Sequence, residues 1–253
     1  MVFETHAFTV NSLGYFSYGL STSDSMTEYE FALSEYLSSF LTDSRRCRFR
    51  DVLANRTNRL TAVLVNLFQQ HNASAVLRTC EALGLQDVYI VESEYDFETN
   101  SEISLGTDRW LNLHQYGGDD AIDRVYSVLR RKGYRILATV PTEMSRSALT
   151  ISYDTPVAFV FGTEKEGLPH LAVELADEAV HLPMYGFVES FNVSVAAALC
   201  LHHAALRIRS GTSDWHIPEL EQARLFLDWT RQSIPGADAI ERRFENAWEG
   251  SRE

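Results

Sequence analysis

The sequence predicts an α/β protein with a mostly parallel sheet and helices on both faces of that sheet. Between residues 61 and 210, short apolar segments of strand length alternate with longer segments of helical periodicity. Glycines that can end a helix follow two of these segments, at Gly84 and Gly133. The chain has 253 residues and is 45% apolar, which is sufficient for a full core. Strands that alternate with helices form parallel sheets covered on both sides.

The elements follow in order along the chain. Residues 1–27 show no clear periodicity, apolar residues recur at helical spacing over 28–41, and a basic helix is expected over 44–53 with Ser44 as its N-cap. Two amphipathic helices are expected near the C-terminus, separated by Pro235 and Gly236. The predicted central strands are 61–67, 87–92, 135–140, 157–161 and 180–184, and the predicted helices are 73–83, 121–132, 170–178, 192–209, 218–233 and 237–248.

This order of elements predicts four parts. They are an N-terminal arm with a helix (1–43), a basic helix (44–60), an α/β domain (61–210) and a C-terminal helical extension (211–253).

Several classes of protein are excluded by composition. No segment approaches the roughly 18 apolar residues of a membrane span, and no Lys or Arg precedes Arg45 to form a basic signal region. Cys47, Cys80 and Cys200 are widely spaced and lack a Cys-x-x-Cys pair, so neither a disulfide framework nor a zinc site is indicated. The sequence therefore predicts a cytoplasmic protein with no membrane segment and no metal.

Charge is distributed unevenly. The net charge is −13, but residues 44–59 hold six arginines and one acid, a local charge of +5, so the remainder carries −18. A focused basic segment on an acidic body suits RNA docking. An arginine-rich helix that is simply solvated is the alternative.

Two glycine-containing segments follow predicted strands. Gly162 and Gly167 have the spacing of a phosphate loop, but Leu168 and Pro169 replace the Lys and Ser/Thr that would grip phosphate and magnesium. The loop is either a tight turn with a solvated Glu164 or part of a binding site. In the second segment, Ser190, Asn192 and Ser194 cluster at a helix start, where they can cap the helix or face a ligand.

A third segment, Asn72-Ala-Ser-Ala-Val-Leu-Arg78-Thr79, begins a helix filled by apolar residues. An arginine buried among such residues needs a partner. Either Arg78 forms a structural ion pair, with Glu164 or Glu81 as candidates, or it has a role in the chemistry.

In this order, the segments beginning at Asn72, Phe161 and Leu182 resemble the three signature motifs of the SpoU branch of the knotted RNA methyltransferases. Within that branch the chain is most similar to the tRNA guanosine 2′-O-methyltransferases of the TrmH type. The resemblance runs from about Arg45 to about Arg243. It implies a C-terminal deep trefoil knot, S-adenosyl-L-methionine as cofactor, a homodimer, and 2′-O-methylation of the D-loop guanosine (guanosine-18) of tRNA.

Residue roles are implied by the same resemblance. Arg78 would lie by the target ribose and phosphate. Because a guanidinium group keeps its proton far above neutral pH, we expect it to stabilise the developing alkoxide. The expected catalytic residues are Arg78, Asn72, Glu164, Ser190 and Asn192. The expected cofactor-binding residues are Thr139, Gly162, Leu182 and Phe191, the last standing where relatives usually have leucine. The expected RNA-binding residues are Arg45, Arg46, Arg48, Arg50, Arg56, Arg207 and Arg209.

Some interpretations stay open at this point. Arg207 and Arg209 also fit as favourable cations at a helix C-terminus. Gln69-Gln70 before His71 replaces a Lys-Pro common in relatives, which removes a positive charge near the expected RNA path. The alternatives to tRNA D-loop methylation are the same chemistry on ribosomal RNA or the tRNA wobble nucleotide, and a non-catalytic RNA-binding protein of the same fold.

Overall fold

The computed structural model describes residues 26–67, 70–92, 106–142, 145–211 and 214–250, and the expected arm over 1–27 lies almost wholly outside them. The chain divides into two compact units, one formed by Arg56–His216 and the other by Met1–Asn55 together with Ile217–Glu253. The sequence predicts separate N-terminal and C-terminal extensions. The structure instead joins their helices in one unit, because their apolar faces share a small core.

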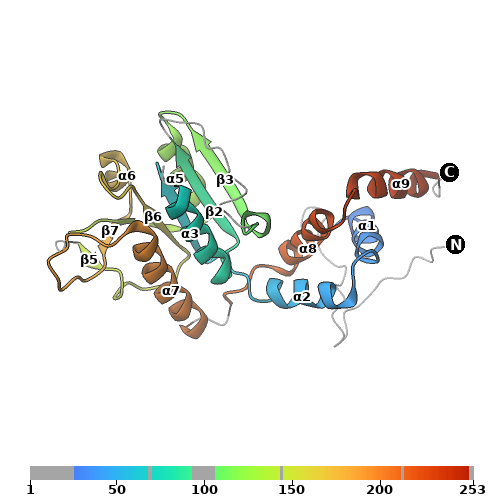
Figure 1. The fold of residues 1–253 in the computed structure, drawn as a ribbon, viewed down its shortest axis with the longest axis horizontal. Coiled ribbons are helices and arrows are strands. Elements are labelled where there is room, and N and C mark those ends of the chain that lie inside the picture. Colours follow the sequence, from blue (N-terminus) through green and yellow to red (C-terminus); the bar gives the residue numbers. More distant parts are fainter. Residues whose placement is uncertain (1–25, 68–69, 93–105, 143–144, 212–213, 251–253) are drawn as a thin grey trace. The chain divides into compact units, whose positions relative to one another are not determined.

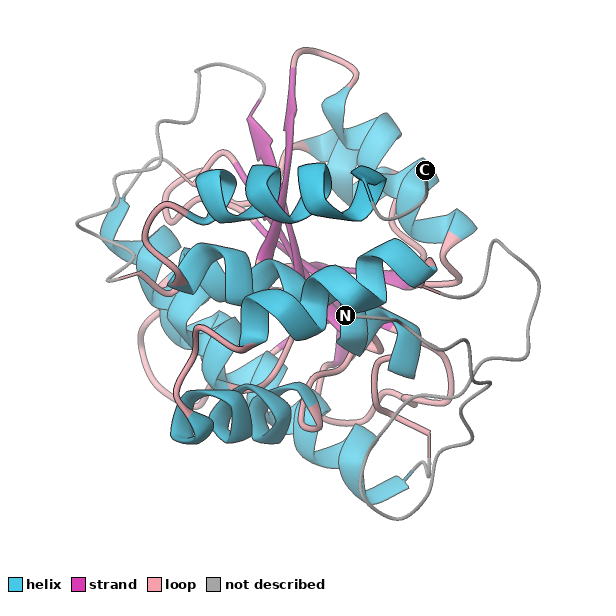
Figure 2. Ribbon diagram, turned by 90° about the vertical axis from the view of Figure 1, so that its right-hand side faces the viewer, coloured by secondary structure: helices cyan, strands magenta, loops and turns pink. Residues whose placement is uncertain are grey.

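The larger unit is built on one seven-stranded sheet in which every strand pair is parallel (Figures 1 and 2). The strand order is β3-β2-β1-β6-β4-β7-β5. This confirms the predicted α/β class with a parallel sheet. The strands are β1 (Leu60–Val65), β2 (Asp87–Glu92), β3 (Asn112–Gly117), β4 (Arg135–Thr139), β5 (Arg146–Ser147), β6 (Val157–Phe161) and β7 (Glu178–His181).

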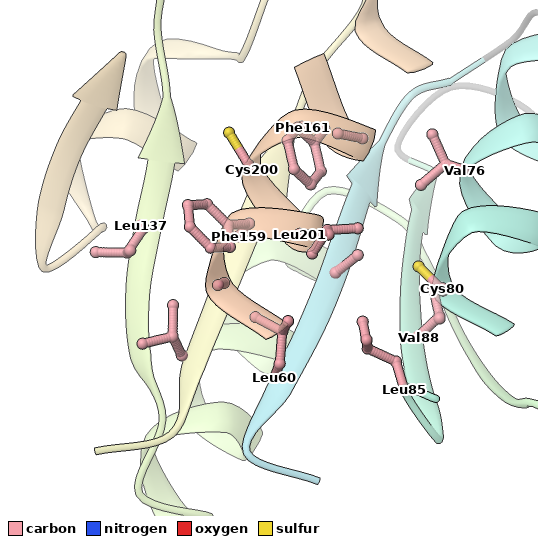
Figure 3. Close-up of a cluster of buried hydrophobic side chains, with 14 of the residues drawn as sticks. Leu60, Val76, Cys80, Leu85, Val88, Leu137, Phe159, Phe161, Cys200 and Leu201 are labelled. Atoms are coloured by element: carbon pink, nitrogen blue, oxygen red, sulfur yellow. The ribbon is translucent and has the colours of Figure 1, made fainter. Parts of the chain in front are cut away.

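Alternation along the strands produces two cores. In β1, Leu60, Ala62 and Leu64 point to one face of the sheet, and Val63 and Val65 to the other. The first face is covered by α3 (Gln70–Ala82) and α7 (Val193–Gly211), which lie side by side in Figure 1. Figure 3 shows the aliphatic and aromatic side chains packed there. The second face is covered by α5 (Ala121–Arg131) and α6 (His170–Glu174). Helices therefore cover both faces of the sheet and exclude water from them, as expected for strands that are apolar along their whole length.

Two strands were missed by the sequence prediction. β3 is an edge strand with the polar sequence Asn-Leu-His-Gln-Tyr-Gly, so it lacks the apolar run that marks a buried strand, and β5 has only two residues. The helix expected over 170–178 ends at Glu174. The backbone N–H of Ile136 donates to the Asp177 carboxylate at 2.7 Å, which draws this segment into the sheet and starts β7 at Glu178.

The smaller unit consists of α1 (Glu28–Ser38), α2 (Asp43–Leu53), α8 (Glu219–Ser233) and α9 (Ala237–Gly250). Its core brings Leu33 and Leu37 of α1 against Leu227 of α8. The predicted N-cap of α2 is wrong by two residues, because Thr42 accepts the hydrogen bond from the Arg45 N–H at 3.2 Å.

Within the described ranges, no helix has the length and apolar character needed to cross a bilayer. The same residues contain no group of three or more His, Cys, Asp or Glu side chains placed to hold a metal ion. All three cysteines are free thiols, with Cys47 exposed and Cys80 and Cys200 buried.

Candidate functional site

A cavity of about 420 Å³ opens where three neighbouring strands end. Thr139 is the last residue of β4, Gly162 follows β6, and Leu182 follows β7, and all three line the cavity. Parallel strands place their carboxyl ends at one edge of the sheet, which is where open α/β sheets bind ligands. The volume falls within the range of small-molecule sites.

One wall of the cavity is the loop after β6, which is tightly closed. Thr163 and Gly167 exchange two backbone hydrogen bonds of 3.0 and 3.1 Å, and the Glu166 N–H donates to the Thr163 hydroxyl at 3.1 Å. Gly167 has φ of +69°, in the region that favours glycine. A Cβ atom on Gly162 would lie 2.2 Å from the Gly167 carbonyl oxygen, so only glycine fits there. The loop is therefore a rigid wall, and both glycines are required to form it.

A polar junction joins the three signature segments beside this wall. The side-chain nitrogen of Asn72 donates to the Glu164 carboxylate. The side-chain nitrogen of Asn192 donates to the side-chain oxygen of Asn72 at 3.3 Å. Asn72 is only 8% exposed, so these bonds lie in a partly dry environment. Residues 120 positions apart in the chain thus meet in one network.

The start of α7 is fixed to the same junction. The side-chain Oδ1 of Asn192 accepts hydrogen bonds from the Ser194 N–H at 3.0 Å and from the Ser194 hydroxyl at 2.6 Å. Asn192 therefore caps the helix with its oxygen and reaches Asn72 with its nitrogen. The cap expected from the sequence is confirmed, and the same side chain reaches the polar junction; a role of Asn192 toward a ligand stays a prediction.

The four residues expected to contact a cofactor all line the cavity. Thr139 donates its hydroxyl to the Val160 carbonyl oxygen at 2.7 Å, so this group is satisfied within the sheet. Leu182 and Phe191 contribute apolar surface, and Glu164 and Ser190 add polar groups to the lining. Cys200 closes the floor, where burial raises the pKa of its thiol to about 12 and keeps it neutral.

Arg78 is placed differently from what the apolar helix sequence predicts. Its side chain is exposed on α3 and forms no ion pair with any residue that the structure describes. Glu164 instead binds Asn72, and Glu81 binds Arg56 at 3.2 Å. The structural ion pair considered for Arg78 is therefore wrong, and its guanidinium faces solvent.

Two of the expected RNA-binding arginines have internal partners instead. The Arg56 side chain is buried, with its residue 0% exposed, and it donates to the Leu85 carbonyl at 2.8 Å as well as pairing with Glu81. Burial lowers the pKa of Arg56 and Glu81 partly offsets this effect. Arg209 donates to the Leu83 carbonyl at 2.8 Å and stacks over the Trp215 ring at 4.7 Å. Arg56 is therefore corrected to a structural residue, because it is buried inside the larger unit. Arg209 is half-exposed, and the printed bond occupies one of its guanidinium nitrogens.

The other expected RNA-binding arginines are more accessible. Arg45, Arg48 and Arg50 are exposed on α2, and Arg46 is half-buried beside Asp43. Arg207 is exposed on α7. Arg56 and Arg59 bind backbone carbonyls in the larger unit. Of the basic segment expected over 44–60, the arginines that remain accessible to a ligand are therefore those of α2.

Several lining residues were missed from the sequence. They lie one or two positions from recognised site residues, so a rule that included two neighbours on each side of those residues would have found them. These residues include Lys165, Glu166, His181, Met184 and Glu189.

Comparisons with known proteins agree with this geometry. Residues 59–202 match the model of the SpoU rRNA Methylase family. The chain is 39% identical over 206 residues to a tRNA (guanosine(18)-2'-O)-methyltransferase of Borreliella burgdorferi, covering 81% of this chain and 93% of that protein. It is 37% identical to the enzyme of the same name from Thermus thermophilus, covering 76% and 98%.

A solved structure gives the same result. The A. aeolicus TrmH/SpoU tRNA modifying enzyme superposes with a TM-score of 0.69 at 28% identity, covering 76% of this chain and 98% of that one. The family match spans the sheet, the cavity and the polar junction, and the relatives are covered almost to their full length. The chain therefore belongs to the SpoU methylase family.

Proposed function

We propose that this protein transfers a methyl group from S-adenosyl-L-methionine to the 2′-hydroxyl of guanosine-18 in the D-loop of tRNA. The observation that carries the proposal is the Asn72–Glu164–Asn192 junction, which gathers the three family segments at the edge of one cavity. The names of the two most similar relatives described above specify the substrate. The chain is an enzyme in this proposal, not an RNA-binding protein that has lost its chemistry.

The cavity fits the proposed cofactor in size and in chemistry. Leu182, Met184 and Phe191 offer apolar surface for the adenine ring, while Thr139 and Gly162 offer backbone groups at strand ends. Carboxylates outnumber the single lysine in the lining, which favours a ligand that carries positive charge. When bound, the cofactor supplies a methyl group on a sulfonium, which needs no metal to activate it.

The residues of the chain then act on the acceptor. Glu164, held by Asn72, and Asn192 would hold the ribose in line with the donor, which supplies much of the rate by orientation. Ser190 lines the cavity beside them. Arg78 would bind the adjoining phosphate and stabilise the alkoxide that forms as the hydroxyl loses its proton.

Docking of the tRNA would use the arginines of α2, assisted by Arg207. Recognition of folded RNA relies on its shape and backbone, so a basic helix can bind it without reading bases. Arg48 illustrates the fit, since it is exposed and makes no ion pair in the described part of the chain.

We also propose that the protein works as a homodimer with a deep trefoil knot, in the cytoplasm. Membership of the SpoU methylase family supports the knot. Dimerisation is supported by exposed apolar residues along one side of α7, namely Val195, Leu199 and Leu206, which are 46%, 45% and 57% exposed. Three free thiols suit a reducing compartment.

The test is transfer of tritium from labelled S-adenosyl-L-methionine into unmodified tRNA transcripts, followed by mapping of the labelled nucleotide. We expect the label on the ribose of guanosine-18. A transcript with 2′-deoxyguanosine at that position should remain unlabelled there, because it lacks the hydroxyl that accepts the methyl group. Label on the wobble nucleotide, or label only in ribosomal RNA, would contradict the proposed substrate. Absence of both transfer and cofactor binding would contradict the enzyme itself.

A further inference from the structure

The proposed site must bind a cationic methyl donor and, at the same rim of the cavity, an anionic RNA. Three carboxylates, those of Glu164, Glu166 and Glu189, line it together with one ammonium group, that of Lys165. Such a negative lining suits a cationic methyl donor. It also repels the phosphates of an RNA whose ribose must come within bonding distance of the donor. The chain as a whole carries −13, so its overall field does not offset this repulsion.

Lys165 occupies the position where this repulsion can be countered. It lies in the closed loop between Thr163 and Gly167, so its backbone is fixed while its side chain is exposed. It follows directly after Glu164, whose carboxylate is held by Asn72 in the polar junction. No hydrogen bond or ion pair links the Lys165 side chain to the described residues. Its ammonium group is therefore available to a ligand.

We propose that Lys165 binds a phosphate of the substrate RNA next to the target ribose; this inference rests on the proposed function. A lysine is a compact point charge on a flexible stem, and it binds phosphate without demanding a fixed bidentate geometry. The exposure of Lys165 places it on the solvent side of the rim, where a macromolecular anion arrives. Its role is to position RNA at an acidic entrance, and it takes no part in the bond changes.

The composition of the chain allows a direct test, because Lys132 and Lys165 are its only lysines. Lys132 follows α5 and donates to the Tyr89 hydroxyl at 2.9 Å, at the opposite, amino-terminal edge of the sheet. The full-length protein is treated with an acetylating reagent alone, with tRNA transcript, and with S-adenosyl-L-methionine, and acetylation of each lysine is measured by mass spectrometry. We expect tRNA to reduce acetylation of Lys165 at least threefold and to leave Lys132 unchanged.

Protection of Lys165 by S-adenosyl-L-methionine and not by tRNA would overturn the inference and assign the lysine to the cofactor carboxylate. Equal acetylation under all three conditions would also overturn it. These outcomes remain distinct from failure of the proposed function, which would show as wild-type protein that neither binds nor methylates tRNA.

Variants provide a second measurement. K165Q should weaken tRNA binding about threefold to tenfold and reduce the slope of log K against log salt by roughly 0.7 to 0.9, the loss of one phosphate contact. K165R should retain most of the affinity, and the neighbouring E166Q should not weaken binding. Cofactor affinity should not fall in K165Q or K165R, because neither variant removes a carboxylate from the lining. Wild-type tRNA affinity and slope in K165Q would overturn the inference.

Discussion

At the scale of the residue, the side chains of the polar junction are held in position by hydrogen bonds to one another. Asn72 links Glu164 to Asn192, so the junction is one network and not three separate motifs. Arg78 stands apart from it on an exposed face, where removal costs the fold little. Function and stability can therefore be separated at Arg78.

Replacement of Arg78 by alanine should reduce methyl transfer to tRNA by about 10²- to 10³-fold, because a cation that stabilises the developing charge is lost. The dissociation constant for S-adenosyl-L-methionine and the melting temperature should stay near the wild-type values. R131A is the matched control, since Arg131 is also exposed and makes no ion pair within the described ranges. Parallel loss of cofactor binding in R78A would make Arg78 a structural residue.

Replacement of Gly162 by alanine should abolish measurable cofactor binding. The new Cβ would meet three backbone atoms of Gly167 and Leu168 at 2.2 to 2.6 Å, and none of them belongs to a flexible side chain. The control is G186A, where an added Cβ has nothing within 4 Å. Isothermal titration with S-adenosyl-L-methionine measures both variants, and normal binding by G162A would contradict the proposed rigid wall.

Prediction from sequence succeeds where local pattern decides the structure. The apolar runs of β2 and β6 are recovered residue for residue, and the segments that hold Asn72, Glu164 and Asn192 are all recognised. Prediction from sequence fails where a contact between distant parts of the chain determines the position of a residue. Nothing local marks Arg56 as buried, because its partners Leu85 and Glu81 lie 25 or more residues away.

At the scale of the element, α2 is the concentrated basic surface of the described chain, and its arginines should determine the salt dependence of tRNA binding. Simultaneous replacement of Arg45, Arg46 and Arg48 by alanine should reduce the slope of log K against log salt by about 2 to 3, since each phosphate contact contributes roughly 0.7 to 0.9. Filter binding over a salt series measures the slope. The pair Arg242 and Arg243 on α9 is the control, and an effect confined to that pair would move the docking surface away from α2.

The start of β2 makes a second prediction at this scale. Burial alone would raise the pKa of Asp87, but bonds from His114 at 2.6 Å and Asn112 at 3.2 Å, with the charge of Lys132, outweigh burial and lower it. A carboxyl whose pKa is lowered by folding stabilises the native state above its unfolded pKa, near 4, and loses this contribution as the pH falls below that value. D87N should therefore be less stable than wild type at pH 7, and the difference should shrink below pH 4. Urea unfolding across pH 3 to 7 measures it, and a constant difference would contradict the assignment.

At the scale of the whole molecule, the exposed apolar side of α7 predicts association of two copies. L199E should convert a dimer to a monomer and lower methyl transfer, because a charge would be buried against the partner. Light scattering coupled to size exclusion measures the mass. L171E is the control on α6, where Leu171 is 39% exposed. A wild-type protein that is monomeric at micromolar concentration would refute the proposal.

The joining of both chain ends in one unit has a consequence for biosynthesis. Leu33 and Leu37 emerge first from the ribosome, yet their packing partners Leu227 and Ile234 are made nearly two hundred residues later. The helix that carries the arginines packs against α8 through Phe49 and Trp229, so it gains this support only after the intervening sheet has been made. A nascent chain therefore lacks the completed helical unit until the strands and loops that line the cavity have been synthesised.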